Sequence, residues 1–269
     1  MTPYVSGNLL IIGGAEDKQK DCKILKYFFQ EAGGRESRIC VITAASENAE
    51  QAAEPYEKLF TSFGCPDLEV LNIYCREDAH SPSNADKIAR ACGLFFTGGD
   101  QLRITAMLGG TVLGKALKDA CERRVIIAGT SAGASVMSDT MIIGGEGDTP
   151  GEDLIQMAPG LGLLKGVIVD QHFAQRGRIG RLLTAVALNP AVLGMGIDED
   201  TAVHVRADGK LWVIGRGTAL LLDASHASLT NVDELFNGRP LALAPVKLHV
   251  LSAGYEFDIL ERTSRTLRQ

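Results

Sequence analysis

The chain lacks the sequence features that would direct it to a membrane or to nucleic acid. Its 269 residues contain no apolar stretch approaching the ~18 residues of a membrane span. Runs of Lys or Arg are also missing, and the formal net charge is −6. The N-terminus has no basic segment followed by a long apolar one. These absences predict a cytoplasmic protein with no membrane partner and no nucleic-acid partner.

Motifs for metals and nucleotides are missing as well. The six cysteines stand apart without C-x-x-C spacing, which is typical of small core residues in a reducing compartment. We therefore expect no metal site. Neither G-x-G-x-x-G nor G-x-x-x-x-G-K-[ST] is present, so no cofactor is predicted. A nucleotide-binding α/β protein that uses Gly13-Gly14 or Gly98-Gly99 is the alternative from another class.

The chain does contain the alternating pattern of an α/β protein. Its length allows one domain over residues 1–269, and its 45% hydrophobic content is typical of globular proteins. Short apolar strands alternate with helices for 200 residues, which indicates a mainly parallel sheet covered on both faces. Hairpin patterns then predict an antiparallel extension of the same domain. Strands are expected at 8–12, 38–43, 68–74, 94–97, 166–169, 203–206, 211–214, 217–222, 246–250 and 255–258. Helices are expected at 24–32, 49–63, 86–91 and 101–117, the last with a glycine interruption.

The most informative segment is Gly129-Thr-Ser131-Ala-Gly133. It follows a β-branched run and precedes a small-residue helix start, which is the context of the G-x-S-x-G nucleophile elbow. Ser131 would then stand at the C-terminal end of a strand, where the active sites of parallel sheets lie. The next N–H, that of Ala132, would point to where an oxyanion forms. An ordinary glycine-rich turn is the alternative. The nucleophile interpretation therefore requires that the chain also supply a general base and an orienting acid.

A base for this serine is sought among five histidines. Only His172 comes shortly after the end of an apolar strand, at 166–169, and so falls at the sheet edge expected for Ser131. Of the others, His80 lies in a polar loop and is expected to be solvated, and His226 lies in a turn. Structural roles are expected for His204 and His249, which lie inside alternating strands.

An orienting carboxylate should reach the far nitrogen of the imidazole. Asp198, Glu199 and Asp200 follow another strand, and strand periodicity does not choose among them. The chain order serine, histidine, acid differs from the serine, acid, histidine order of α/β-hydrolases and argues against that family.

Five segments, matched in order along most of the chain, carry a resemblance to a known family. They are Gly13-Gly-Ala-Glu-Asp-Lys18, Phe95-Phe-Thr-Gly-Gly-Asp-Gln-Leu-Arg103, Gly129-Thr-Ser-Ala-Gly-Ala134, Asp170-Gln-His-Phe173 and Gly196-Ile-Asp-Glu-Asp-Thr201. Together they resemble the cyanophycinases, serine exopeptidases related to the peptidase E (aspartyl dipeptidase) group. The resemblance implies a flavodoxin-like, class I glutamine amidotransferase-like three-layer sandwich.

The resemblance also implies roles for single residues. Ser131 would be the nucleophile, His172 the general base and Glu199 the orienting acid. The Gly99 N–H would join the Ala132 N–H in the oxyanion hole. Substrate-binding residues would be Gln101, Asp170, Gln171, Arg176, Arg178 and Arg181.

Three guanidiniums near a catalytic loop suit a bidentate grip on substrate carboxylates. The alternative for Arg176, Arg178 and Arg181 is a solvated helix start or pairing with neighbouring acids. Gln101 and Gln171 could likewise be loop-bracing amides rather than substrate ligands.

By this resemblance the substrate is cyanophycin, a poly-aspartate whose side chains carry arginine, cleaved to β-Asp-Arg dipeptides. A homodimer is implied too. An aspartyl or isoaspartyl dipeptidase with the same triad is the alternative among enzymes, and a non-catalytic amidotransferase-like scaffold is a third reading. The segment 146–153, which matches the family loosely, is expected to border the substrate groove.

Overall fold

A nine-stranded sheet is the largest element of the computed structural model, which describes residues 5, 7–145, 155–237 and 239–266. Its first five strands run parallel, and from the fifth strand outward the pairing is antiparallel. The predicted α/β class with a C-terminal antiparallel extension is thereby confirmed. In spatial order the strands are β3 (Asp67–Leu71), β2 (Arg38–Ile42), β4 (Gly93–Phe96), β5 (Ile126–Thr130), β1 (Asn8–Ile12), β10 (Thr201–Val205), β11 (Lys210–Gly215), β16 (Tyr255–Asp258) and β17 (Thr263–Thr266).

Helices cover both faces of the parallel half of the sheet. Alternate residues of β1 belong to different apolar clusters. Leu10 and Ile12 pack with the helices α1 (Lys23–Glu31) and α2 (Ala49–Ser62), whereas Leu9 and Ile11 pack with α3 (Pro82–Arg90), α4 (Gln101–Leu108) and α5 (Val112–Glu122). The helical segment predicted at 101–117 is interrupted by glycine as expected and forms two helices, with Gly110 at a φ of +71° between them. The helices are α1 (Lys23–Glu31), α2 (Ala49–Ser62), α3 (Pro82–Arg90), α4 (Gln101–Leu108), α5 (Val112–Glu122), α6 (Ala132–Ser135) and α7 (Ile179–Leu188), with 3₁₀ turns η1 (Gly34–Glu36), η2 (Glu77–His80), η3 (Ala174–Arg176) and η4 (Val232–Asn237).

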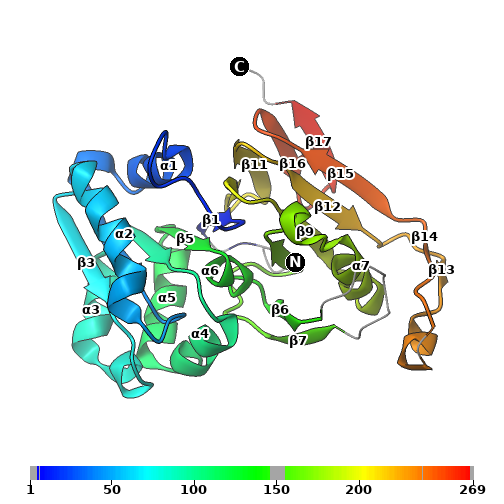
Figure 1. The fold of residues 1–269 in the computed structure, drawn as a ribbon, viewed down its shortest axis with the longest axis horizontal. Coiled ribbons are helices and arrows are strands. Elements are labelled where there is room, and N and C mark those ends of the chain that lie inside the picture. Colours follow the sequence, from blue (N-terminus) through cyan, green and yellow to red (C-terminus); the bar gives the residue numbers. More distant parts are fainter. Residues whose placement is uncertain (1–4, 6, 146–154, 238, 267–269) are drawn as a thin grey trace.

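Four further strands form a second sheet, which the alternation pattern does not predict. In spatial order they are β8 (Val167–Gln171), β9 (Leu193–Ile197), β12 (Ala219–Asp223) and β15 (Lys247–Leu251). The first pair is parallel and the others are antiparallel. Two short hairpins, β6 (Thr140–Gly144) with β7 (Gln156–Pro159) and β13 (Leu229–Thr230) with β14 (Leu243–Ala244), complete the strands. Figure 1 shows β3, α2 and α3 at one end of the molecule and β15, β16 and β17 toward the other.

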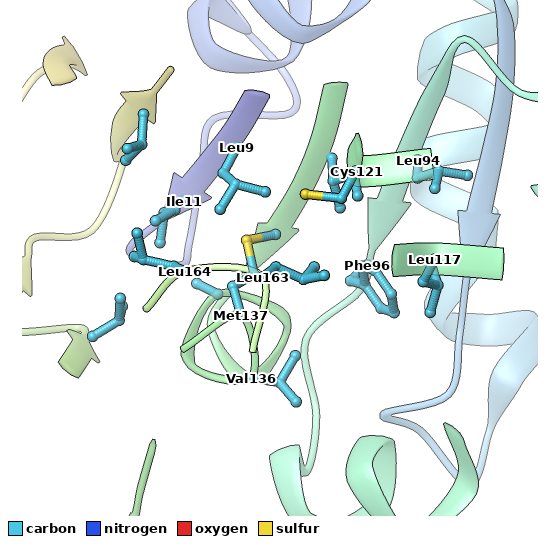
Figure 2. Close-up of a cluster of buried hydrophobic side chains, with 14 of the residues drawn as sticks. Leu9, Ile11, Leu94, Phe96, Leu117, Cys121, Val136, Met137, Leu163 and Leu164 are labelled. Atoms are coloured by element: carbon cyan, nitrogen blue, oxygen red, sulfur yellow. The ribbon is translucent and has the colours of Figure 1, made fainter. Parts of the chain in front are cut away.

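One apolar core joins the two sheets. It includes Leu9 and Phe96 from the nine-stranded sheet and Val169 and Met195 from the four-stranded one, all fully buried. Such a shared core is what a single domain over 1–269 requires, and that assignment stays a prediction. Figure 2 shows part of this core, where side chains gather from β1, β4, α5 and the segments that follow α6 and β7, among them Leu9, Ile11, Leu94, Phe96, Leu117, Cys121, Val136, Met137, Leu163 and Leu164.

The fold brings the C-terminal ends of strands from both sheets to one place. The Ser131 N–H, just after β5, donates to the Ile12 carbonyl at the end of β1 (3.0 Å). The His172 N–H, just after β8, donates to the Gly13 carbonyl (2.8 Å). The nucleophile and base suggested by the sequence therefore lie on either side of the chain leaving β1.

Two further findings concern the described part of the chain. None of its helices is both long and apolar enough to cross a bilayer. No group of three or more His, Cys, Asp or Glu side chains within the same residues is placed to hold a metal ion.

Candidate active site

Ser131 sits in a sharp turn between β5 and α6. Its backbone adopts φ 53° and ψ −112°, a sparsely populated conformation, and the residue is half-buried. The glycines on both sides are sterically required. A Cβ on Gly129 would lie 2.2 Å from the Gly133 carbonyl oxygen, and one on Gly133 would lie 2.8 Å from Cβ of Phe96. The close approach of strand and helix at this turn is therefore possible only with glycine at both positions.

His172 contacts this serine directly. Its Nε2 lies 3.0 Å from Oγ of Ser131, within hydrogen-bond reach for a general base. On the other side of the ring, Nδ1 lies 2.6 Å from Oε1 of Glu199. Because a carboxylate only accepts, the geometry favours the tautomer with the proton on Nδ1, which leaves Nε2 free to accept from the serine hydroxyl.

Of the three consecutive acids, only Glu199 contacts the imidazole. They lie in the turn between β9 and β10, where strand alternation no longer applies. Asp198 accepts hydrogen bonds from the Ala174 N–H (3.1 Å) and from the N–H and hydroxyl of Thr218 (3.0 and 2.8 Å). It therefore braces the loop after His172 instead of orienting the ring.

Asp200 holds the other side of the same turn. Its Oδ1 accepts from the Asp17 N–H at 2.9 Å, and its Oδ2 lies 3.3 Å from Nε of Arg216.

One residue that the sequence patterns did not identify also belongs to the site: Oε1 of Gln175 accepts from the Glu199 N–H at 3.0 Å. A glutamine three residues after a histidine carries no signal that could have singled it out.

Gly99 lies in the loop that follows β4, the strand that pairs with β5. Its φ of +146° and the 2.3 Å that would separate a Cβ from the Ala45 carbonyl oxygen both require glycine. The preceding Gly98 lies against Ser131, since a Cβ there would come within 3.5 Å of the serine Cβ. Among the described residues, neither the Gly99 nor the Ala132 N–H donates to a protein acceptor. Both N–H groups are therefore available as donors.

The residues proposed to bind substrate differ strongly in exposure. Asp170 is 1% exposed, and Arg181 forms a two-pronged ion pair with it, Nε to Oδ2 at 2.7 Å and Nη2 to Oδ1 at 2.5 Å. Arg178 donates from Nη1 to the backbone oxygen of Gln171 (2.5 Å) and to its side-chain oxygen (3.0 Å). The side chains of Arg178 and Arg181 are 11% and 10% exposed, whereas Arg176 is exposed.

The remaining predicted residues are partly engaged by the protein. Nε2 of Gln101 donates to the Ile142 carbonyl oxygen at 3.1 Å, so this amide braces the β6 strand. Gln171 is 6% exposed and accepts from Arg178. Segment 146–153 lies outside the described residues.

Comparison with known proteins places this chain in a family. The sequence model of Peptidase family S51 matches residues 9–213 of this chain. Cyanophycinase from Trichormus variabilis (strain ATCC 29413 / PCC 7937) is 40% identical over 257 residues, which cover 95% of this chain and 86% of the relative. Cyanophycinase from Geminocystis herdmanii (strain PCC 6308) is 38% identical over 260 residues, 96% of each chain.

A solved structure shows the same fold at low identity. The crystal structure of a peptidase from an acI-B1 Actinobacterium superposes with a TM-score of 0.68 at 20% identity, covering 98% of both chains. The chain belongs to peptidase family S51 and is a serine peptidase. The resemblance to cyanophycinases stated from the five sequence segments is confirmed.

Proposed function

We propose that this chain hydrolyses cyanophycin to β-Asp-Arg dipeptides, with Ser131, His172 and Glu199 as the catalytic triad. The observation that carries the proposal is the continuous line of contacts from Glu199 Oε1 through both imidazole nitrogens to Oγ of Ser131, at 2.6 and 3.0 Å. The substrate class comes from the cyanophycinases that match over nearly the whole chain.

In the first half of the reaction Oγ of Ser131 attacks the backbone carbonyl carbon between two β-Asp-Arg units. Nε2 of His172 takes the hydroxyl proton, and Glu199 stabilises the imidazolium that results. The N–H groups of Gly99 and Ala132 hold the oxyanion of the tetrahedral intermediate. When the intermediate collapses, the C–N bond breaks and His172 gives its proton to the leaving amine.

In the second half a water molecule attacks the ester formed on Ser131. His172 takes a proton from this water and returns it to Oγ as the C–O bond to the serine breaks. The acyl group leaves as a carboxylate, and the triad returns to its starting state. Every proton transfer passes through the single nitrogen that lies 3.0 Å from Oγ.

The proposed substrate-binding residues fall into two groups. Arg176 is exposed and can bind a free carboxylate near the end of the cyanophycin polymer, which would favour exo cleavage. Arg178 and Arg181 are held by Gln171 and Asp170, so these four residues form a supporting cluster beside the base. Gln101 completes the proposed set from the start of α4. A homodimer and a cytoplasmic location remain predictions.

The test is the length distribution of soluble products released from purified cyanophycin granules, measured by mass spectrometry. We expect β-Asp-Arg dipeptide as the only product from the earliest time points. Longer oligomers would show endo cleavage and would contradict the proposed binding of the polymer end by Arg176. Absence of release, combined with cleavage of a free aspartyl dipeptide, would identify the chain as a small-peptide dipeptidase.

A further inference from the structure

A buried carboxylate contacts the residue that precedes Ser131. The side chain of Glu16 is 1% exposed, and it accepts from the Tyr56 hydroxyl through Oε1 (2.6 Å) and from the Thr130 hydroxyl through Oε2 (2.5 Å). Nζ of Lys18 lies 2.7 Å from Oε1. Burying a carboxylate is costly unless it is paired and hydrogen-bonded, and each oxygen here has a partner. The reaction described above uses none of these four residues.

The hydrogen bond to Thr130 fixes the residue that precedes the nucleophile. Ser131 occupies a backbone conformation that persists only where its surroundings over-determine it. The Ser131 N–H is held by the Ile12 carbonyl, and the Thr130 side chain is held by Glu16 from the loop that follows Ile12. The elbow is therefore secured by a backbone contact and a side-chain contact, both from the same segment.

The same loop also holds the other two members of the triad. The Gly13 carbonyl accepts from the His172 N–H at 2.8 Å, and the Gly14 carbonyl accepts from the Asp200 N–H at 3.0 Å, one residue after Glu199. Both His172 and Asp200 have a φ of +48°. One short loop thus contacts the backbone beside each of the three reacting side chains.

We propose that Glu16 is a positioning residue for the nucleophile, acting through Thr130 to hold Ser131 Oγ within reach of His172. The inference rests on the proposed function, because it takes Ser131 as the nucleophile. Burial, with the Glu16 carboxylate beside it, raises the pKa of the Tyr56 phenol, so Tyr56 stays a donor and fixes Glu16 from the side away from the elbow.

Two isosteric variants separate positioning from a purely structural role. Thr130→Val and Tyr56→Phe each remove one hydroxyl donor from the same buried carboxylate, so both should lower the unfolding temperature. Only Thr130→Val removes the hydrogen bond between Glu16 and the residue that precedes Ser131. Thr130→Ser keeps the hydroxyl and serves as the conservative rescue. Glu16→Gln, which replaces one carboxylate oxygen by a donor, is the second variant should Thr130→Val fail to fold.

The readout is the rate at which a serine-reactive phosphonate modifies Ser131, followed by intact mass at a temperature where each variant is folded by circular dichroism. We expect labelling to slow about tenfold to a hundredfold in Thr130→Val and in Glu16→Gln. The labelling rates of Thr130→Ser and Tyr56→Phe should stay within about threefold of that of the unsubstituted chain. Both variants keep a hydroxyl at residue 130 that can donate to Glu16, so Ser131 should not be displaced.

Two outcomes overturn the inference in distinguishable ways. If the unsubstituted chain is labelled and all four variants are labelled equally fast, Glu16 is only a structural carboxylate and the proposed function stands. If the unsubstituted chain is not labelled at Ser131, the nucleophile assignment itself fails and the inference fails with it.

Discussion

The imidazole of His172 packs against Gly14, in the space that a side chain at position 14 would fill. A Cβ on Gly14 would lie 2.4 Å from Cε1 and 2.5 Å from Nε2 of that ring. Gly14 also adopts a φ of +99°, which side chains rarely tolerate. The loop after β1 therefore determines the position of the general base by close contact as well as by hydrogen bonding.

Gly14→Ala should disable the base while leaving most of the fold intact. The methyl group forces the imidazole away from Ser131, and a shift of about 1 Å can cost roughly a hundredfold in rate. We expect kcat to fall by about that factor, measured by dipeptide release under saturating substrate. Gly254→Ala is the matched control, because Gly254 has a φ of +96° and open space around it. Equal kcat values for the two variants would rule out the steric account.

Arg181→Ala should destabilise the protein, because it removes one partner of the buried Asp170 carboxylate. Breaking such a pair typically costs about 3–5 kcal/mol in the free energy of unfolding, which urea titration measures. Arg239→Ala serves as control, since its ion pair with Glu234 is exposed and should contribute less than about 1 kcal/mol. An unchanged stability for Arg181→Ala, with only KM raised, would instead assign this arginine to substrate binding alone.

The buried His204 should make the fold sensitive to acid. Burial, aided by Arg206, lowers the pKa of His204 to about 4 from its usual 6.5. Between these two values the unfolded chain binds a proton that the folded chain does not, so stability is lost as pH falls from 6.5 toward 4. Between pH 7 and pH 5 the loss should be about 2 kcal/mol.

A neutral substitution tests this assignment. His204→Gln cannot take up the proton, so its free energy of unfolding should change by about 2 kcal/mol less than that of the unsubstituted chain between pH 7 and pH 5. Urea titration at the two pH values gives both differences. Parallel pH profiles would show that another group causes the acid sensitivity.

Apolar patterning was sufficient to predict the parallel half of the sheet, the helices on its faces and the antiparallel hairpin that follows residue 200. It could not predict that β8 and β9 leave the main sheet. A short buried parallel strand has the same pattern in either sheet, and its partner is decided by packing between distant segments.

The candidate site was predictable to a similar extent. The glycines around Ser131 and the position of His172 after a strand are local signals, and both residues lie where these signals indicated. The choice of Glu199 could not follow from periodicity, because residues 198–200 form a turn in which alternate residues do not share a face. The contacts of Glu16 were also beyond sequence patterns, since Tyr56 and Thr130 lie 40 and 114 residues away.

The most direct test of the account compares the unsubstituted chain with Ser131→Ala on purified cyanophycin, with soluble products measured by mass spectrometry. Circular dichroism confirms that both are folded. The account predicts that the unsubstituted chain releases β-Asp-Arg and that Ser131→Ala loses this activity by at least about a thousandfold, since the attacking oxygen is gone. Release of the same dipeptide at a comparable rate by folded Ser131→Ala would contradict it.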